Sequence, residues 1–427
     1  MTTSKSEEEK GEEDDTLELV AHCLCKAQRF TAQVPRSSLP LKAAYCHCTS
    51  CRRVTGALHS TYVPWPGSAA DILESSSLRR YAYAPHLTLF SCSVCSSNMF
   101  VEKTDVNDPP SYGAQTGVLT NIDLPDLINI TNHVFLGDTL DDGASPWLCD
   151  ANKDGSRPRL WRGARGQSQE LSSTDHHHWP AAGLSHRPSE DTDIPVRCHC
   201  GGVDLVLHRP MADFAAARER SEELPWFVDP VSKKSRAAFD ACDSCRLWSG
   251  SDIFYWTFVL LHHLAFPAPK SDSDSPPQIQ PHANFPESSL ELKTAVSSVD
   301  KRDPRWGTLT FYESSPDVQR YFCSKCAACV FYASDDRPEM VDLAIGLLDS
   351  GDGSRAESLL AWDYGGKIGW KEDVVGGWRE GFIESVEAAA ERWRIERDYP
   401  KSWRRRQMEG KKASPVASNA PIEQSAN

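Results

Sequence analysis

The chain has 427 residues, of which 40% are hydrophobic and 25% charged, and its formal net charge at pH 7 is -14. That length exceeds what one ordinary hydrophobic core accommodates and favours two or three domains. No apolar run approaches the roughly 18 residues of a membrane span, so we expect no membrane partner. The acidic balance argues against a general nucleic-acid binder, because such proteins neutralise phosphates with Lys and Arg.

The first residues, up to about residue 16, are rich in Glu and Asp and predict a disordered acidic tail. They lack the basic start and the apolar stretch of a secretory signal, which indicates a cytoplasmic protein, with the nucleus as the alternative. Because a reducing compartment disfavours disulfides, the fifteen cysteines indicate metal or thiol chemistry.

Residues 17–161 predict a first module made mainly of short β-strands, since β-branched and aromatic segments such as Ser60-Thr61-Tyr62-Val63 are broken by Pro, Gly and Ser. Residues 162–193 shift in composition to Gly, Ser, Asp, His and Pro, which indicates a linker. We expect a second module of the same type over residues 194–371.

Residues 372–427 predict a C-terminal α-helix followed by a basic tail. Apolar residues recur there at steps of three or four, which is the periodicity of a helix; they are Trp378, Phe382, Val386, Ala389 and Trp393. We expect this apolar stripe to pack on the second module. A helix that binds a partner protein is the alternative.

Cysteines recur in one order in the two modules. The first copy comprises Cys23, Cys25, Cys46, Cys48, Cys51, Cys92 and Cys95, and the second comprises Cys198, Cys200, Cys242, Cys245, Cys323 and Cys326. The copies differ at one position, because Asp240 stands where the first copy has Cys46. The repeat predicts equivalent sites in both modules. The substitution predicts that the middle site of the second module differs in its ligands from that of the first.

The outer cysteines of each copy predict a closed, structural zinc site. A pair of cysteines close in sequence, completed by a distant second pair, meets the requirement of a tetrahedral zinc–thiolate site. The predicted ligands are Cys23, Cys25, Cys92 and Cys95 in the first module and Cys198, Cys200, Cys323 and Cys326 in the second.

The middle cysteines of the first copy, Cys46, Cys48 and Cys51, predict an open zinc site. A zinc ion held by three protein ligands keeps a fourth position for water or substrate, which is typical of a catalytic site. A thiol bound there would lose its proton and become a positioned thiolate. The alternative is that His47 or His59 supplies a fourth ligand and closes the site.

The corresponding residues of the second copy are Asp240, Cys242 and Cys245. They could bind zinc, because a carboxylate oxygen is an acceptable ligand, or Asp240 could be a surface carboxylate beside an empty site. Next to the first open site, Arg52 and Arg53 could receive the carboxylate of an acidic thiol substrate.

Together these motifs resemble the family of the glutathione-dependent formaldehyde-activating enzyme and centromere protein V. The first module carries the resemblance in Cys23-Leu24-Cys25, Cys46-His47-Cys48-Thr49-Ser50-Cys51 and Cys92-Ser93-Val94-Cys95. The second carries it in Cys198-His199-Cys200-Gly201-Gly202-Val203, Cys242-Asp243-Ser244-Cys245 and Cys323-Ser324-Lys325-Cys326. The chain therefore looks like a tandem of the family's domain.

The resemblance implies two Mss4-like domains of small antiparallel sheets and a carbon–sulfur lyase activity. It implies structural zinc on the outer pairs, catalytic zinc on the middle triad, and glutathione that combines with formaldehyde to give S-hydroxymethylglutathione. Because Asp240 breaks the triad, we do not extend catalysis to the second module. A non-catalytic, zinc-stabilised binding or scaffold protein is the competing hypothesis.

The chain also departs from the family where glycine is usual. Beside the first pair it has Ala21 and Lys26, and after the last pairs it has Ser96 and Ala327. Such a replacement is tolerated at a tight turn when the backbone torsion φ is negative.

Overall fold

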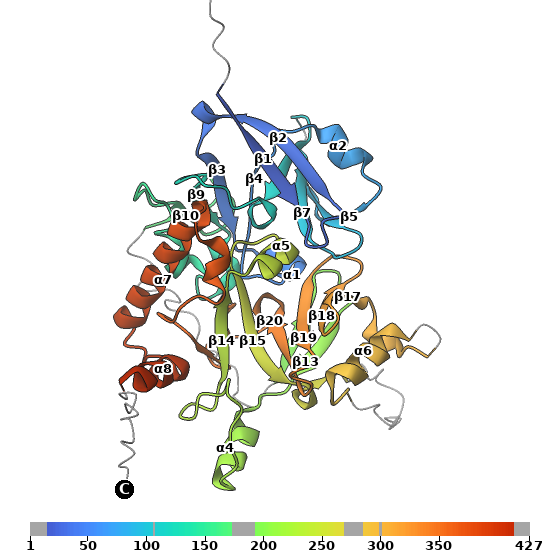
Figure 1. The fold of residues 1–427 in the computed structure, drawn as a ribbon, viewed down its shortest axis with the longest axis vertical. Coiled ribbons are helices and arrows are strands. Elements are labelled where there is room, and N and C mark those ends of the chain that lie inside the picture. The colour runs from blue at the N-terminus through green and yellow to red at the C-terminus, as the bar shows by residue number, and fades with distance from the viewer. Residues whose placement is uncertain (1–14, 106, 173–192, 269–284, 299–300, 414–427) are drawn as a thin grey trace, which may run out of the picture.

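A computed structural model describes residues 15–105, 107–172, 193–268, 285–298 and 301–413. Two mainly β modules lie against each other, the first above the second in the view of Figure 1, and the expected fold class is confirmed. Most of the acidic tail, residues 173–192 of the expected linker and the end of the basic tail lie outside the described residues. Within them, no helix has the length and apolar character needed to cross a membrane.

The first module contains a two-stranded and a nine-stranded sheet. The small sheet pairs β1 (Thr16–His22) with β2 (Arg29–Pro35). The large sheet has the order β11 (Glu170–Leu171), β10 (Arg159–Trp161), β9 (Ile128–Val134), β3 (Leu41–Cys46), β4 (Ser60–Pro64), β8 (Ser111–Gln115), β7 (Asn98–Lys103), β6 (Leu87–Cys92) and β5 (Leu78–Ala84). Since β11 belongs to this sheet, the module extends into the segment expected to be a linker.

The second module repeats this arrangement. A three-stranded sheet contains β12 (Ile194–Arg197), β13 (Asp204–Leu207) and β16 (Leu264–Ala265). A seven-stranded sheet has the order β17 (Leu309–Ser315), β18 (Val318–Cys323), β19 (Cys329–Ser334), β20 (Met340–Ala344), β15 (Phe254–Leu260), β14 (Ser235–Asp240) and β21 (Leu360–Trp362). Strand for strand this matches β5-β6-β7-β8-β4-β3-β9, including the parallel pairing at the end. The cysteine repeat is thus a repeat of structure.

Helices connect the strands and cover the modules. They are α1 (Thr49–Thr55), α2 (Ala69–Glu74), α3 (Ser145–Leu148), α4 (Met211–Glu219), α5 (Asp243–Ser249), α6 (Ser289–Ser297), α7 (Trp378–Glu396) and α8 (Trp403–Ala413). Short 3-10 turns include η2 (Thr116–Val118) and η7 (Ile345–Leu347). Figure 1 shows α1 and α5 between the two modules; α1 follows β3 and α5 follows β14.

The modules contact each other through two equivalent backbone hydrogen bonds, in each of which a 3-10 turn of one module donates to the end of a helix of the other. The amide of Gly346 in η7 donates to the carbonyl of Gly56 at the end of α1 (3.0 Å), and the amide of Gly117 in η2 donates to the carbonyl of Gly250 at the end of α5 (2.9 Å). A Cβ atom on Gly346 would lie 2.2 Å from the carbonyl oxygen of Ala57. Only glycine permits this approach, so the equivalent glycines of the two modules allow the modules to pack closely against each other. The buried apolar residues of both modules form one continuous core.

The C-terminal helix α7 lies across both modules. It packs against α3 of the first module, and the amide of Trp378 donates to the carbonyl of Ile122 (3.0 Å). Its neighbour Arg379 pairs with Asp252 of the second module (2.7 Å). The expected packing of the apolar stripe on the second module therefore describes only part of its contacts, because the helix also packs on the first module. The stripe itself exists, since Trp378, Val386, Ala389 and Trp393 are buried and Phe382 is partly buried.

Candidate metal centres

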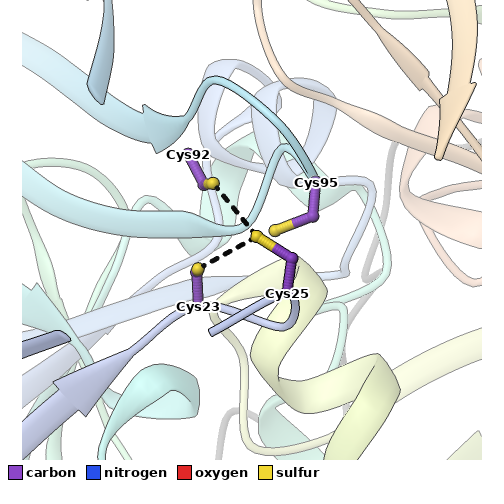
Figure 2. Close-up of side chains that lie close together, drawn as sticks. All are labelled: Cys23, Cys25, Cys92 and Cys95. Atoms are coloured by element: carbon purple, nitrogen blue, oxygen red, sulfur yellow. Dashed lines mark hydrogen bonds between the residues drawn. The ribbon is translucent and has the colours of Figure 1, made fainter. Parts of the chain in front are cut away.

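The outer cysteines of the first module converge on one point (Figure 2). Their four sulfur atoms lie within 4.8 Å of one another, with Cys23 Sγ 3.4 Å from Cys25 Sγ and Cys25 Sγ 3.7 Å from Cys92 Sγ. A zinc–sulfur bond of about 2.3 Å places the sulfurs of a tetrahedral site about 3.8 Å apart. The donor set and its spacing therefore fit a zinc ion.

Local backbone structure holds these sulfurs in position. Cys23 and Cys25 lie in the turn after β1, and Cys92 ends β6 at the turn that leads to β7. The amide of Gln28 donates to Cys23 Sγ (3.2 Å), and Ser97 Oγ lies 3.2 Å from Cys95 Sγ. Donors aimed at the sulfurs stabilise the thiolate form that a metal requires.

The outer cysteines of the second module repeat the same geometry. Cys200 Sγ lies 3.6 Å from Cys198 Sγ and 3.4 Å from Cys323 Sγ, and Cys326 completes the group within 4.8 Å. The amide of Val203 donates to Cys198 Sγ (3.2 Å). This donor set also fits zinc, so both predicted structural sites are assembled as four-sulfur groups.

The residues that replace the family's usual glycines at these turns have positive backbone torsions φ, whereas a negative φ was the condition for tolerating the replacement. Lys26 has φ 63°, Ser96 has φ 62° and Ala327 has φ 65°, all in the left-handed region. The condition of a negative torsion is thus not met. At the position of Lys26 the second module has Gly201, with φ 70°. The three side chains are held in a conformation that costs a non-glycine residue about 1–2 kcal/mol, which the surrounding sites must offset.

Exchanging the residues at these equivalent turns is expected to change stability in opposite directions. Lys26→Gly should raise the free energy of unfolding by about 1 kcal/mol, because Lys26 is exposed and loses little contact. Gly201→Lys should lower it by a similar amount, since no atom within 4 Å would obstruct a Cβ there and only the torsion is affected. Urea unfolding of both zinc-loaded variants measures this. Equal stabilities would contradict the torsional explanation.

The middle cysteines of the first module lie at the junction of β3 and α1. The sulfurs of Cys46, Cys48 and Cys51 lie within 4.8 Å of one another; Cys51 is buried and the other two are partly exposed. Cys48 is the N-cap of α1, and its sulfur accepts from the amide of Cys51 (3.3 Å). Hydrogen bonds from the other two thiols lower the pKa of Cys48 to about 3, which favours a thiolate at this position.

Neither histidine proposed as a fourth ligand joins this group. Among the described residues the group of candidate ligand atoms contains the three cysteines alone. His47 Nε2 lies 3.0 Å from His133 Nδ1, and the ring of His59 packs 4.7 Å from that of Tyr45. Burial lowers the pKa of His59 to about 4, so its ring is neutral at pH 7. The fourth position is left without a described histidine, cysteine or carboxylate.

Aromatic residues of both modules lie next to the open triad. Burial raises the pKa of Tyr62 to about 12 and that of Tyr83 well above its usual value, and the charges of Cys51 and Cys46 add to both shifts. The ring of His199, from the second module, lies 6.1 Å from that of Tyr83, and His199 Nδ1 lies 2.8 Å from the Tyr81 hydroxyl. The surroundings of the first site therefore include a residue that sequence reasoning assigned only to the other module.

The two arginines after Cys51 already have protein partners. Arg52 is buried and its guanidinium donates to Thr49 Oγ1 (3.2 Å) and to the carbonyl of Asp138 (3.3 Å). Arg53 pairs with Asp349 of the second module at 2.9 Å and is partly exposed. A role of either residue in substrate binding stays a prediction, and of the two Arg53 has the more accessible guanidinium.

The middle site of the second module has a different environment. The ligand atoms of Asp240, Cys242 and Cys245 lie within 4.8 Å of one another. Asp240 is partly buried and accepts from the amide of Cys242 (2.8 Å), so it is not a freely solvated surface carboxylate. The guanidinium of Arg320 lies 3.7 Å from Cys245 Sγ. Sequence reasoning missed Arg320, although aligning the two copies places it opposite the apolar Leu89.

Comparison with known proteins identifies the first module. The family model of the glutathione-dependent formaldehyde-activating enzyme matches residues 18–138, which contain all seven patterned cysteines of the first copy. Neither the curated proteins nor the solved structures include a significant match to the chain. A domain of this family is therefore present at residues 18–138. The resemblance of residues 194–371 to the family, and that to centromere protein V, stay predictions.

Proposed function

We propose, from the family domain at residues 18–138, that the chain is a zinc-dependent carbon–sulfur lyase that joins a thiol, glutathione, to formaldehyde. The observation that carries the proposal is the triad of Cys46, Cys48 and Cys51, whose sulfurs converge without a fourth described ligand. Two of these sulfurs are partly exposed, so a small thiol can approach them. The outer sites, in contrast, have all four positions filled by cysteine.

Zinc held by the triad would accept a substrate thiol in its fourth position and favour the thiolate form of that thiol at neutral pH. The protein residues prepare this position. Cys48 is fixed by the amide of Cys51, and nearby the ring of Tyr83 lies 6.1 Å from that of His199. Because His199 belongs to the second module, the proposed site has a neighbour from that module although catalysis is assigned to the first.

The proposed reaction is an addition that needs no oxidant or reductant. The thiolate sulfur attacks the carbonyl carbon of formaldehyde, a carbon–sulfur bond forms, and the carbonyl π bond breaks. The resulting alkoxide oxygen takes up one proton, which balances the proton lost by the thiol. The product is the S-hydroxymethyl thiol, and its cleavage is the reverse reaction. A carboxylate of glutathione could reach Arg53, whose present partner is Asp349.

Replacement of a triad cysteine is expected to abolish this activity. Cys48→Ser should lower the rate of S-hydroxymethylglutathione formation above the uncatalysed background by at least about 100-fold, because three-ligand zinc binding is lost. The matched control is Cys242→Ser, the equivalent position of the second module, which should retain activity. Product formation can be followed by NMR with purified, zinc-loaded protein.

The competing scaffold hypothesis makes a different prediction for the same proteins. If neither the zinc-loaded wild type nor Cys48→Ser formed or cleaved the adduct above background, and the wild type held zinc at the outer sites alone, the lyase proposal would be wrong. Loss of one zinc ion in Cys48→Ser together with loss of activity would support it.

A further inference from the structure

We propose that the middle site of the second module holds no zinc, and that the guanidinium of Arg320 takes the place of the cation there. Arg320 lies on β18, three residues before Cys323, and its side chain is buried. Leu89 lies on β6, three residues before Cys92, and is also buried. An apolar side chain near the first site is thus replaced by a permanent cation at the second.

The contacts of Arg320 aim its charge at the thiols. Its Nη1 atom lies 3.7 Å from Cys245 Sγ, and its Nε atom donates to Ser314 Oγ (3.2 Å). No carboxylate of the described residues lies within ion-pair distance of this guanidinium. A buried guanidinium is unfavourable unless polar or charged groups compensate it. Here it faces the sulfur of Cys245, and the carboxyl groups of Asp240 and Asp342 act on it from beyond ion-pair distance.

Two residues that contact Arg320 also differ between the modules in a way that favours a cation in the second module. The guanidinium of Arg320 lies over the rings of Trp248 (5.5 Å) and Tyr332 (5.1 Å), both of which favour a cation at their faces. The equivalent residues of the first module are Val54, three residues after Cys51, and Val101, six residues after Cys95. Arginine and its two aromatic neighbours in the second module therefore replace three buried aliphatic residues.

A zinc ion on the same sulfurs would lie close to the arginine. A zinc–sulfur bond of about 2.3 Å on Cys245 would place the ion at most about 6 Å from Arg320 Nη1, in a site with little water to screen two cations. The ligand set is also weaker, because Asp240 replaces a thiolate and its carboxylate already accepts the Cys242 amide. The donor set of the second middle site thus does not fit zinc, whereas that of the first does.

Zinc counting on the full chain tests this assignment, with elemental analysis of wild type and Cys245→Ser as the first pair. We expect both proteins to hold the same number of zinc ions, while Cys51→Ser, the equivalent change in the first module, loses one. A wild type that holds one ion more than Cys245→Ser would overturn the inference. The comparison uses only this difference, so it is independent of whether the first module proves to be a lyase.

A restored site gives the converse test. Asp240→Cys alone is expected to add no zinc, because Arg320 remains, whereas Asp240→Cys combined with Arg320→Leu reproduces the first-module residues at both positions and should add one ion per chain. Retention of the other zinc ions and an unchanged circular dichroism spectrum serve as the folding control. If the folded double variant added none, or the single variant already added one, Arg320 would not be the residue that excludes the metal.

Discussion

Cys326→Ser, which removes one ligand of the outer site of the second module, is expected to unfold both modules rather than one. Zinc binding supplies about 10–16 kcal/mol of apparent free energy in small zinc peptides, which equals or exceeds the about 5–15 kcal/mol that stabilises a typical domain. Cys326 is buried, and its sulfur belongs to the outer four-sulfur group of the second module, with Cys198, Cys200 and Cys323. A serine there leaves three thiolates without a complete tetrahedron.

The loss should spread to the first module because the two share one core. Gly346 of the second module contacts Gly56 of the first through a backbone hydrogen bond, and the amide of His199, beside Cys198 and Cys200, donates to the carbonyl of Arg53 (3.0 Å). Unfolding the second module would expose these contacts and the apolar surface beneath them. We therefore expect one cooperative transition for both modules.

Thermal unfolding followed by circular dichroism and zinc release measures this effect. Cys149→Ser is the matched control, because Cys149 is a cysteine outside the four metal-binding groups, and its replacement should leave the zinc content unchanged. Two separate transitions in Cys326→Ser, with the first module still holding its zinc, would contradict a shared core. Chelation of wild-type zinc should reproduce the single transition of the variant.

The paired cysteines allowed the sequence to predict which residues would meet. A CxC turn and a distant CxxC turn can bind one tetrahedral ion only if all four sulfurs come together. The spacing of Cys23, Cys25, Cys92 and Cys95 was therefore sufficient to predict their convergence. The mainly β fold could be predicted for a similar reason, since short β-branched segments between Pro and Gly have few alternatives. The C-terminal helix followed from its apolar periodicity.

Contacts between residues far apart in the sequence, within one module or between the two, could not be predicted from the same patterns. The side chain of Arg320 meets Cys245 across 75 residues, and no local spacing encodes that meeting. His199 is next to zinc-site cysteines in sequence but also lies beside Tyr83 of the other module. The position of α7 across both modules depends in the same way on tertiary packing, because an apolar stripe specifies a buried face and not the surface that covers it.

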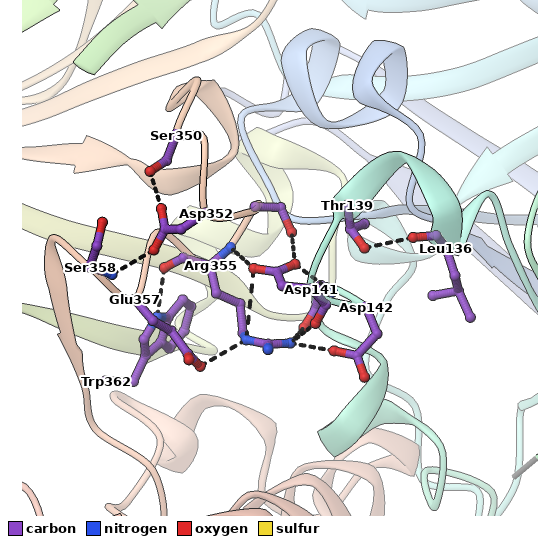
Figure 3. A network of polar contacts seen from close by, with 12 residues as sticks. Leu136, Thr139, Asp141, Asp142, Ser350, Asp352, Arg355, Glu357, Ser358 and Trp362 are labelled. Atoms are coloured by element: carbon purple, nitrogen blue, oxygen red, sulfur yellow. Dashed lines mark hydrogen bonds and ion pairs between the residues drawn. The ribbon is translucent and has the colours of Figure 1, made fainter. Parts of the chain in front are cut away.

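Arg355→Met is expected to lower the free energy of unfolding by about 3–5 kcal/mol, because it removes one partner from a buried ion network between the modules. Figure 3 shows the Arg355 side chain reaching from the second module to Asp141 and Asp142 of the first. Its Nη1 atom donates to Asp142 Oδ1 and to the carbonyl of Gly143 (2.8 Å), and its Nε atom donates to Glu357 Oε1 (2.9 Å).

The size of the effect follows from what remains after the arginine is removed. Asp141 and Asp142 are 4% and 2% exposed, so their charges cannot be solvated in the folded chain. Burial raises the pKa of Asp141, against the opposing effect of Arg355, and without that arginine the carboxyl would favour its neutral form more strongly. For Arg355 itself, burial tends to lower the pKa, but Asp141, Glu357 and Asp142 raise it well above its usual value, so the guanidinium remains charged.

A second arginine that contacts the first module, from the C-terminal helix, provides the matched control. Arg392 on α7 pairs with Asp150 of the first module, and both side chains remain partly exposed to solvent. Because water and salt screen such a pair, Arg392→Met should lower the free energy of unfolding by at most about 1 kcal/mol. Urea unfolding of both variants at fixed zinc content separates the two cases. A loss below about 1 kcal/mol for Arg355→Met would mean that the modules are held together by apolar packing and backbone contacts, with no net stabilisation from the buried ions.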